Sequence, residues 1–190
     1  MSKRGLLLVI SGPSGVGKSA LGKLLLERNT GICYSVSATT RPPRLQEVEG
    51  ESYFFFSTEE FVRLRDKGGF LEWAEVYGNY YGTPKEAVEK LLSAGRDVVL
   101  EIDTQGAAQV KQICPEGILI FIMPPSAEEL KHRITKRGSE TEESLNRRLA
   151  AAASEMELAA EYDHIVVNHT LAAAVKEVEA IIANEHRKNN

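Results

Sequence analysis

The chain has 190 residues, of which 43% are hydrophobic, 26% charged and 7% aromatic. This composition is typical of a globular domain with a substantial core, and it excludes collagen-like, low-complexity and disordered chains. The net charge of −4 argues against a protein that binds nucleic acid polymers, because such affinity comes from basic surface.

Cysteine content and hydropathy predict a cytoplasmic protein. Cys33 and Cys114 are too few for a disulfide scaffold, and both sit near apolar residues, so we interpret them as buried free thiols. The apolar runs Leu6–Ile10 and Ile118–Met123 are far shorter than the roughly 20 residues of a transmembrane helix. We therefore expect no membrane partner.

Predicted strands and helices alternate along most of the chain. Apolar runs without polar alternation indicate buried strands, and the segments between them indicate helices. In chain order the predicted elements are a strand at Leu6–Ile10, a helix at Ala20–Arg28, strands at Ile32–Val36 and Tyr53–Phe56, a helix from Ser57 to Gly68, a hairpin of Phe70–Val76 and Asn79–Tyr81, a helix from Pro84 to Gly95, a strand at Asp97–Ile102, a helix at Gln105–Ile113, a strand at Ile118–Met123, helices at Ser126–Arg137 and Thr141–Ala160, a strand at His164–Val167 and a helix at Leu171–Arg187.

Strands separated by helices predict an α/β fold with a mostly parallel sheet. The segment 35–82 departs from this pattern, because it holds short strands, a hairpin and most of the aromatic residues. We interpret it as a small lobe inserted into a single domain.

The segment between the first strand and the first helix matches the phosphate-loop pattern G-x-x-x-x-G-K-[ST] in full. Its glycines allow backbone N–H groups to wrap a phosphate, and the following helix adds its positive end. In this pattern Lys18 reaches the β- and γ-phosphates, and the Ser19 hydroxyl binds Mg²⁺. The predicted phosphate-binding residues are Gly12, Pro13, Ser14, Gly15, Val16, Gly17, Lys18 and Ser19.

Two further features are candidate contacts for a ligand. Arg41 and Arg44 lie on a proline-stiffened loop, where each can grip a phosphate bidentately or remain a solvated surface residue. Glu72 lies beside Trp73 in an apolar stretch, where a carboxylate needs a partner. Guanine offers two adjacent N–H donors to such a carboxylate, although an outward-facing glutamate on an edge strand fits the pattern as well.

Charged residues also gather near the expected ends of core elements. Glu101 and Asp103 close a buried strand on one side of it, and can hold Mg²⁺ waters or substrate hydroxyls or simply be solvated. Arg133 and Arg137 recur at i, i+4 on one helix, which fits a site or a salt-bridged exterior. No nucleophile is required, because direct phosphoryl transfer rests on positioning and charge neutralisation.

From about Gly5 to His186, the sequence resembles the bacterial form of guanylate kinase. The resemblance rests on the phosphate loop and on the stretches SVSATTRPPR (35–44), FLEWA (70–74), GNYYGT (78–83), EIDTQG (101–106) and RGSETEE (137–143). It implies a three-layer P-loop NTPase fold that transfers the γ-phosphoryl group of Mg²⁺-bound ATP to GMP. It implies a core of 1–34, 83–136 and 149–190, a GMP-binding lobe at 35–82 and a mobile helical lid at 137–148.

The resemblance also assigns roles to individual residues. Arg41, Arg44, Tyr53 and Tyr81 would hold the GMP phosphate. Glu101 and Asp103, between the two nucleotides, would also belong to the GMP-binding residues. The guanine base would contact Ser37, Glu72 and Thr83. ATP would contact Arg133 and Asn168 beside the phosphate loop, and the catalytic residues would be Lys18, Arg41, Arg137 and Arg148.

The chain departs from the family pattern after Asn168, where His169 and Thr170 stand in place of two common acids, and at Thr104, where relatives often have tryptophan. Two alternatives stay open. One is a related module that binds phosphopeptides without catalysis, and the other is a P-loop kinase for another phosphorylated acceptor, such as ribose 1,5-bisphosphate. The intact phosphate loop with Lys18 favours a kinase, and Glu72 favours guanine. The resemblance leaves a monomer and a homodimer equally open.

Overall fold

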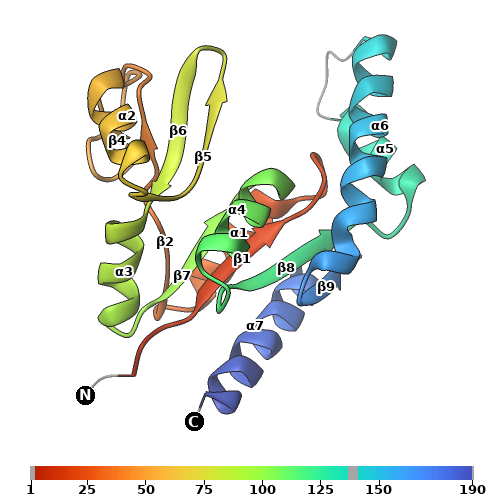
Figure 1. The fold of residues 1–190 in the computed structure, drawn as a ribbon. Helices are drawn as coiled ribbons and strands as arrows, with labels where there is room; N and C mark the ends of the chain where they lie inside the picture. Colours follow the sequence, from red (N-terminus) through yellow and green to blue (C-terminus); the bar gives the residue numbers. More distant parts are fainter. Residues whose placement is uncertain (1–2, 137–140, 190) are drawn as a thin grey trace.

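The computed structural model describes residues 3–136 and 141–189. Two sheets organise these residues (Figure 1). The larger sheet is parallel, with the strand order β2–β7–β1–β8–β9. Its strands are β1 (Leu7–Ser11), β2 (Ile32–Tyr34), β7 (Asp97–Glu101), β8 (Ile118–Met123) and β9 (His164–Val167).

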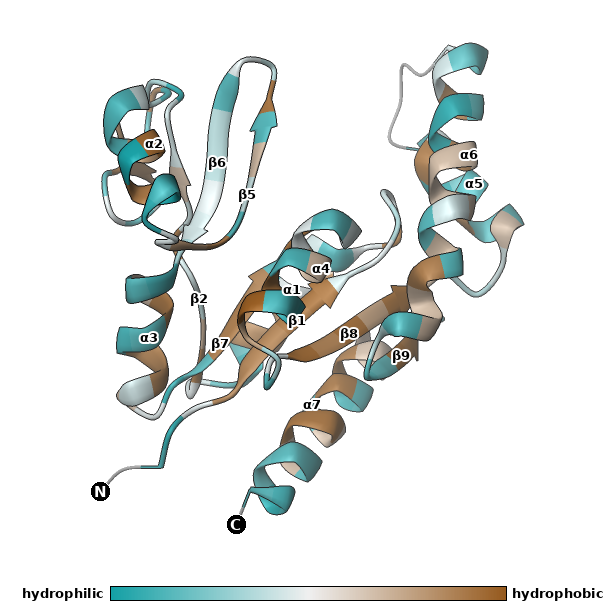
Figure 2. Cartoon of the chain, in the orientation of Figure 1, coloured by the Kyte–Doolittle hydropathy of each residue, from teal (hydrophilic) through white to brown (hydrophobic). Residues whose placement is uncertain are grey.

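The larger sheet is buried on both faces because its central strands are apolar throughout. Along β1, Leu8 and Ile10 pack into one core cluster, whereas Leu7 and Val9 pack into another on the opposite face. Figure 2 shows this contrast as brown central strands beneath helices that are mostly teal on their outer sides. The result is a three-layer arrangement, as the sequence predicted.

Helices from different parts of the chain form the two outer layers. One cluster joins β1 and β8 to side chains of α1, α5, α6 and α7, and the other joins β1 and β7 to α3 and α4. The helices are α1 (Lys18–Arg28), α2 (Thr58–Asp66), α3 (Lys85–Ser93), α4 (Thr104–Ile113), α5 (Ala127–Lys136), α6 (Glu142–Glu157), the 3₁₀ helix η1 (Leu158–Glu161) and α7 (Leu171–Lys188).

The smaller sheet has the order β4–β3–β6–β5 and lies wholly between positions 38 and 84. An aromatic cluster joins it to α2, with Phe61 stacked on Phe70 at 4.3 Å between ring centroids. Figure 1 shows this sheet and the α5–α6 pair rising on opposite sides above the larger sheet. Its strands are β3 (Ala38–Thr39), β4 (Phe54–Phe55), β5 (Phe70–Val76) and β6 (Asn79–Pro84).

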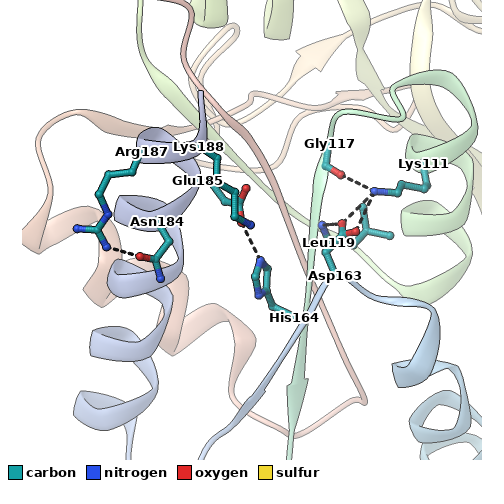
Figure 3. Close-up of polar contacts among 9 residues, drawn as sticks. All are labelled: Lys111, Gly117, Leu119, Asp163, His164, Asn184, Glu185, Arg187 and Lys188. Atoms are coloured by element: carbon teal, nitrogen blue, oxygen red, sulfur yellow. Dashed lines mark hydrogen bonds and ion pairs between the residues drawn. The ribbon is translucent and has the colours of Figure 1, made fainter. Parts of the chain in front are cut away.

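The edge strand β9 is fixed by polar contacts at its start (Figure 3). The Asp163 carboxylate accepts from Lys111 Nζ at 2.9 Å and from the backbone N–H of Leu119 at 2.8 Å. The ring of His164 lies 3.2 Å from the carboxylate of Glu185 on α7. These contacts anchor the end of the chain to the sheet, opposite the small lobe.

Most predicted elements are confirmed, with differences at their ends. The strand predicted at Ile32–Val36 ends at Tyr34, because the chain then turns into the smaller sheet, where the carbonyl of Ser37 accepts from Phe54 N–H. The two-residue strand β3 was not predicted. The helix predicted to reach Ala160 narrows to 3₁₀ geometry from Leu158.

Both cysteines are free, with Cys114 buried and Cys33 half-buried. Within residues 3–136 and 141–189, none of the helices has the length and apolar character needed to cross a bilayer.

Candidate active site

The phosphate loop joins the end of β1 to the start of α1. Gly12, Gly15 and Gly17 have φ values of 140°, 89° and 103°, which L-residues with side chains rarely adopt. At Gly12 there is no room for a side chain, because a Cβ there would lie 2.4 Å from the carbonyl oxygen of Ile122. The glycines therefore let the loop curl tightly against β8, with the amino end of α1 behind it.

Two polar side chains of the loop already have partners. The ammonium group of Lys18 donates to the loop carbonyls of Gly12 at 2.6 Å and Pro13 at 3.3 Å. The Ser19 hydroxyl donates to Glu101 Oε1 at 2.5 Å, and the Tyr34 hydroxyl lies 3.4 Å from the other oxygen of the same carboxylate. Burial, together with the charge of Glu101, raises the pKa of Tyr34 to about 12.

A cavity of about 240 Å³ opens beside the loop, in the place expected for the phosphates. Lys18 and Ser19 line it, together with the carboxylates of Glu101, Asp103 and Glu155. Asp103 also caps helix α4 by accepting from Gly106 N–H at 2.8 Å. The cavity thus combines a cation and loop amides with acidic groups, a mixture suited to a phosphate chain that arrives with a metal ion.

A second cavity, of about 370 Å³, lies on the other side of the loop. Asn168 and Arg133 form one wall of it: Asn168 donates to the carbonyl of Val16 at 2.8 Å, and Arg133 donates to the carbonyl of Asn168 at 3.0 Å. A salt bridge of 2.8 Å to Glu129 orients the Arg133 guanidinium. These two predicted ATP residues therefore lie together beside the loop, on the side away from Glu101.

Helix α6 reaches the phosphate loop through two residues. Arg148 donates to the Ser14 hydroxyl at 3.0 Å. The Glu155 carboxylate faces the backbone N–H of Ser14, and burial raises its pKa although the charge of Lys18 opposes that change. Arg148 is thus adjacent to the loop, and its role on the transferring phosphoryl group stays a prediction. Arg137, the other arginine expected there, lies outside the described residues.

The arginine loop of the smaller sheet forms a cluster with two tyrosines. The Arg41 guanidinium stands over the ring of Tyr53, 5.6 Å from its centroid, and the Tyr53 and Tyr81 rings lie 6.2 Å apart. Arg41 is held by both carboxylate oxygens of Glu47, at 2.8 and 3.0 Å, and the same carboxylate accepts from the backbone N–H of Arg44. Glu47 thus forms a salt bridge with the Arg41 guanidinium, the group that was predicted to hold the GMP phosphate.

The predicted base-recognition residue Glu72 lies on β5, opposite Thr83 of β6. The buried Thr83 hydroxyl donates to Glu72 Oε1 at 2.6 Å. Burial raises the pKa of the Glu72 carboxyl, and the nearby negative charge of Asp103 adds to this shift. Asp103 follows strand β7 of the larger sheet and caps helix α4, so Glu72 faces the core of the protein from the smaller sheet.

The structure therefore groups the predicted residues into a phosphate-loop group and a small-sheet group. Glu101 contacts Ser19 beside the phosphate loop, and its place between the two nucleotides stays a prediction. Ser37 is half-buried just before β3, and the Arg44 side chain is exposed.

Sequence reasoning missed Tyr34, Glu47 and Glu155. Glu47 has one usable signal, a carboxylate three residues after Arg44 on the same turn. Tyr34 and Glu155 contact the site only through the fold, and no local pattern marks them.

Comparisons with known proteins agree with this geometry. A family model described as guanylate kinase matches residues 4–185. The chain is 51% identical to the guanylate kinase of Clostridioides difficile over 98% of this chain and 91% of the relative. It is 52% identical to that of Caldanaerobacter subterraneus over 97% and 90%. Its structure resembles the crystal structure of guanylate kinase from Anaplasma phagocytophilum, with a TM-score of 0.72, 37% identity and coverage of 97% and 87%.

Proposed function

The chain belongs to the guanylate kinase family, and we infer from this that it transfers the γ-phosphoryl group of ATP to GMP, giving ADP and GDP. In the reaction a phosphate oxygen of GMP attacks the γ-phosphorus as the bond to the β–γ bridging oxygen breaks. No covalent intermediate on the protein is needed, because positioning and charge neutralisation lower the barrier.

The observation that carries this proposal is the half-buried Glu72 carboxylate in a chain whose phosphate loop is complete. Thr83 fixes one carboxylate oxygen from the neighbouring strand. A carboxylate held in this way is an acceptor for the N1–H and N2–H groups of guanine, and it repels the ring acceptor that adenine presents instead. Lys18, at the start of helix α1 in the core, supplies the positive charge for the transferring phosphates.

In the proposed complex, GMP lies between the lobe 35–82 and the core. Arg41 exchanges Glu47 for the GMP phosphate, with Tyr53, Tyr81 and Arg44 beside it. Ser37 and Thr83 complete the base site, and Glu101 and Asp103 lie between the nucleotides. ATP takes the phosphate loop and the cavity lined by Arg133 and Asn168. The lid 137–148 brings Arg137 and Arg148 to the transferring group, where they act with Lys18 and Arg41.

The donor set beside the phosphate loop fits Mg²⁺. Ser19 Oγ and a Glu101 carboxylate oxygen lie 2.5 Å apart, and Asp103 lines the same cavity. Hydroxyl and carboxylate oxygens are the ligands that Mg²⁺ prefers. Ser19 would bind the ion that arrives with ATP, and Glu101 would orient the Ser19 hydroxyl. When bound, Mg²⁺ neutralises negative charge on the β- and γ-phosphates.

A coupled assay of ADP release with AMP, GMP, CMP and UMP as acceptors tests the proposal. We expect kcat/KM for GMP to exceed that for AMP by about 10⁴-fold or more, because the base site leaves polar groups unpaired with adenine. Glu72→Ala should lower the GMP/AMP ratio of kcat/KM, because it weakens the binding of GMP. Glu75→Ala, which changes an exposed carboxylate on the same strand, should leave it unchanged.

Two outcomes would contradict the proposal. Turnover of ribose 1,5-bisphosphate in preference to GMP would point to another acceptor. Phosphopeptide capture without any ADP release would point to a binding module. We further propose a cytoplasmic enzyme without a nucleic acid partner, present as a monomer or homodimer, which sedimentation equilibrium would distinguish.

A further inference from the structure

Helix α4 of the core is joined to strand β5 of the small sheet by one side chain. The Gln109 amide oxygen accepts from the backbone N–H of Trp73 at 3.1 Å, and its amide nitrogen donates to the backbone carbonyl of Trp73 at 3.1 Å. Gln109 therefore pairs with Trp73 as a residue of a neighbouring strand would.

This contact closes an open edge of the small sheet. Strand β5 is the terminal strand in the order β4–β3–β6–β5, so its outer N–H and C=O groups have no strand beside them. Trp73 is paired with Gly82 on the inner side. The Gln109 amide supplies the missing donor and acceptor at this position, next to Glu72.

The register of β5 is irregular at this point. Phe70 pairs with Pro84 and Glu72 pairs with Thr83, so Leu71 is an extra residue, a β-bulge. Leu71 turns into the core cluster that contains Ala107 and Val110 of α4. A bulge re-aims the side chains that follow it, and the direction of Glu72 therefore depends on what fixes the strand after the bulge.

Helix α4 contacts β5 along one face. Gly106 and Gln109 are three residues apart and lie on the same side of the helix. At Gly106 a Cβ would come within 3.4 Å of Glu72 Oε2, so the helix passes close to the carboxylate itself. The same helix thus approaches the Glu72 side chain with Gly106 and holds the neighbouring backbone with Gln109.

We propose that Gln109 is a positioning residue for guanine recognition: by pairing with the backbone of Trp73, it holds β5 so that the Glu72 carboxylate faces the N1–H and N2–H groups of the acceptor base. This inference rests on the proposed function. It assigns to a core helix a part in the specificity of the small lobe.

The test compares GMP with IMP, whose base lacks the 2-amino group. A correctly aimed Glu72 makes one more charged hydrogen bond to GMP, which corresponds to a preference of roughly tenfold or more. Gln109→Met keeps the length of the side chain without the two hydrogen bonds. We expect it to reduce the GMP/IMP ratio of kcat/KM by about fivefold or more, and to leave the Kd for ATP unchanged.

Matched controls separate positioning from loss of folding. Gln112→Met changes an exposed glutamine on the same helix and should preserve the GMP/IMP ratio. In a Glu72→Ala background, Gln109→Met should have no further effect on GMP, because its action passes through the carboxylate. Gln109→Asn, which keeps an amide but cannot span the same distance, provides a second variant if Gln109→Met does not fold.

The inference is wrong if Gln109→Met and Gln109→Asn keep the wild-type GMP/IMP ratio of kcat/KM. An equal loss of kcat/KM for both substrates keeps this ratio and would indicate a general effect on the lobe. Failure of the proposed function is distinguishable, because the unsubstituted protein would then release no ADP with GMP.

Discussion

The two sheets present polar groups to a ligand in different ways. The larger sheet is apolar and buried, and the phosphate loop at its edge offers mainly backbone N–H groups fixed by glycine geometry. The smaller sheet is aromatic and half-exposed, and it offers side chains held by other side chains, as in the pairs Arg41–Glu47 and Glu72–Thr83. The phosphates, which many nucleotides share, would thus be bound by backbone N–H groups. The base, which distinguishes one nucleotide from another, would be bound by side chains. Substitutions in the first region should impair transfer, and those in the second should impair acceptor binding.

The largest effect is expected at Lys18. Lys18→Ala should lower kcat by about 10³-fold with a small change in the KM for GMP, because the ammonium acts on charge that develops during transfer. Steady-state kinetics measures this split. Lys23→Ala, an exposed lysine on the same helix, is the control. Near-normal turnover of Lys18→Ala would contradict the assignment of phosphoryl transfer to the phosphate loop and of acceptor binding to the smaller sheet.

Arg148 on helix α6 is also expected to affect transfer more than acceptor binding. Arg148→Ala should lower the single-turnover transfer rate by about 10²-fold, with little change in the Kd for GMP, because its guanidinium acts on the moving phosphoryl group. The exposed neighbour Arg147 offers the matched substitution Arg147→Ala. Equal rates in the two variants would leave Arg148 as a solvated helix residue.

In the small lobe, Arg41→Ala should weaken the free energy of GMP binding by about 1.5–3 kcal/mol, since one charge-assisted contact is lost. The Kd for ATP should stay within a few-fold, because Arg41 follows strand β3 of the smaller sheet, whereas the phosphate loop follows strand β1 of the larger sheet. Calorimetry with each nucleotide measures both values, and Arg63→Ala on the exposed side of α2 controls for charge. An equal loss of ATP affinity would contradict the separation.

The smallest effect concerns pH. Burial raises the pKa of Glu72, so this carboxyl takes up a proton at a higher pH than an ordinary glutamate and then loses an acceptor for guanine. GMP binding should therefore weaken as the pH falls below neutral, beginning at a higher pH than an ordinary glutamate carboxyl would give. The phosphate of GMP titrates in this range too, so Glu72→Gln supplies the reference profile. Parallel profiles would show that Glu72 does not titrate in the site.

The sequence predicted the three-layer core and the phosphate loop because both depend on local signals. The run at Leu6–Ile10 is apolar enough to be a buried strand in any arrangement, and the glycines around Lys18 specify a loop geometry by themselves.

The polar pairs of the small sheet could not be predicted in this way. Arg41 meets Glu47 because the intervening loop turns through Gln46, whose φ is 76°. Gln109 meets Trp73 only after α4 and β5 have packed. The Arg41–Glu47 pair depends on the conformation of one loop, and the Gln109–Trp73 pair depends on a tertiary contact; hydrophobic periodicity encodes neither.

The strand order of the larger sheet also has a consequence for how the chain is made. Strand β1 is central, and its partners β7 and β8 begin at Asp97 and Ile118. During synthesis at roughly 5–20 residues per second, this apolar strand therefore waits on the order of 5–20 s for its neighbours. The smaller sheet is complete by position 84 and can pair earlier. We expect the nascent chain to expose this apolar, unpaired strand during the interval, so that binding by a ribosome-associated chaperone would be most useful then.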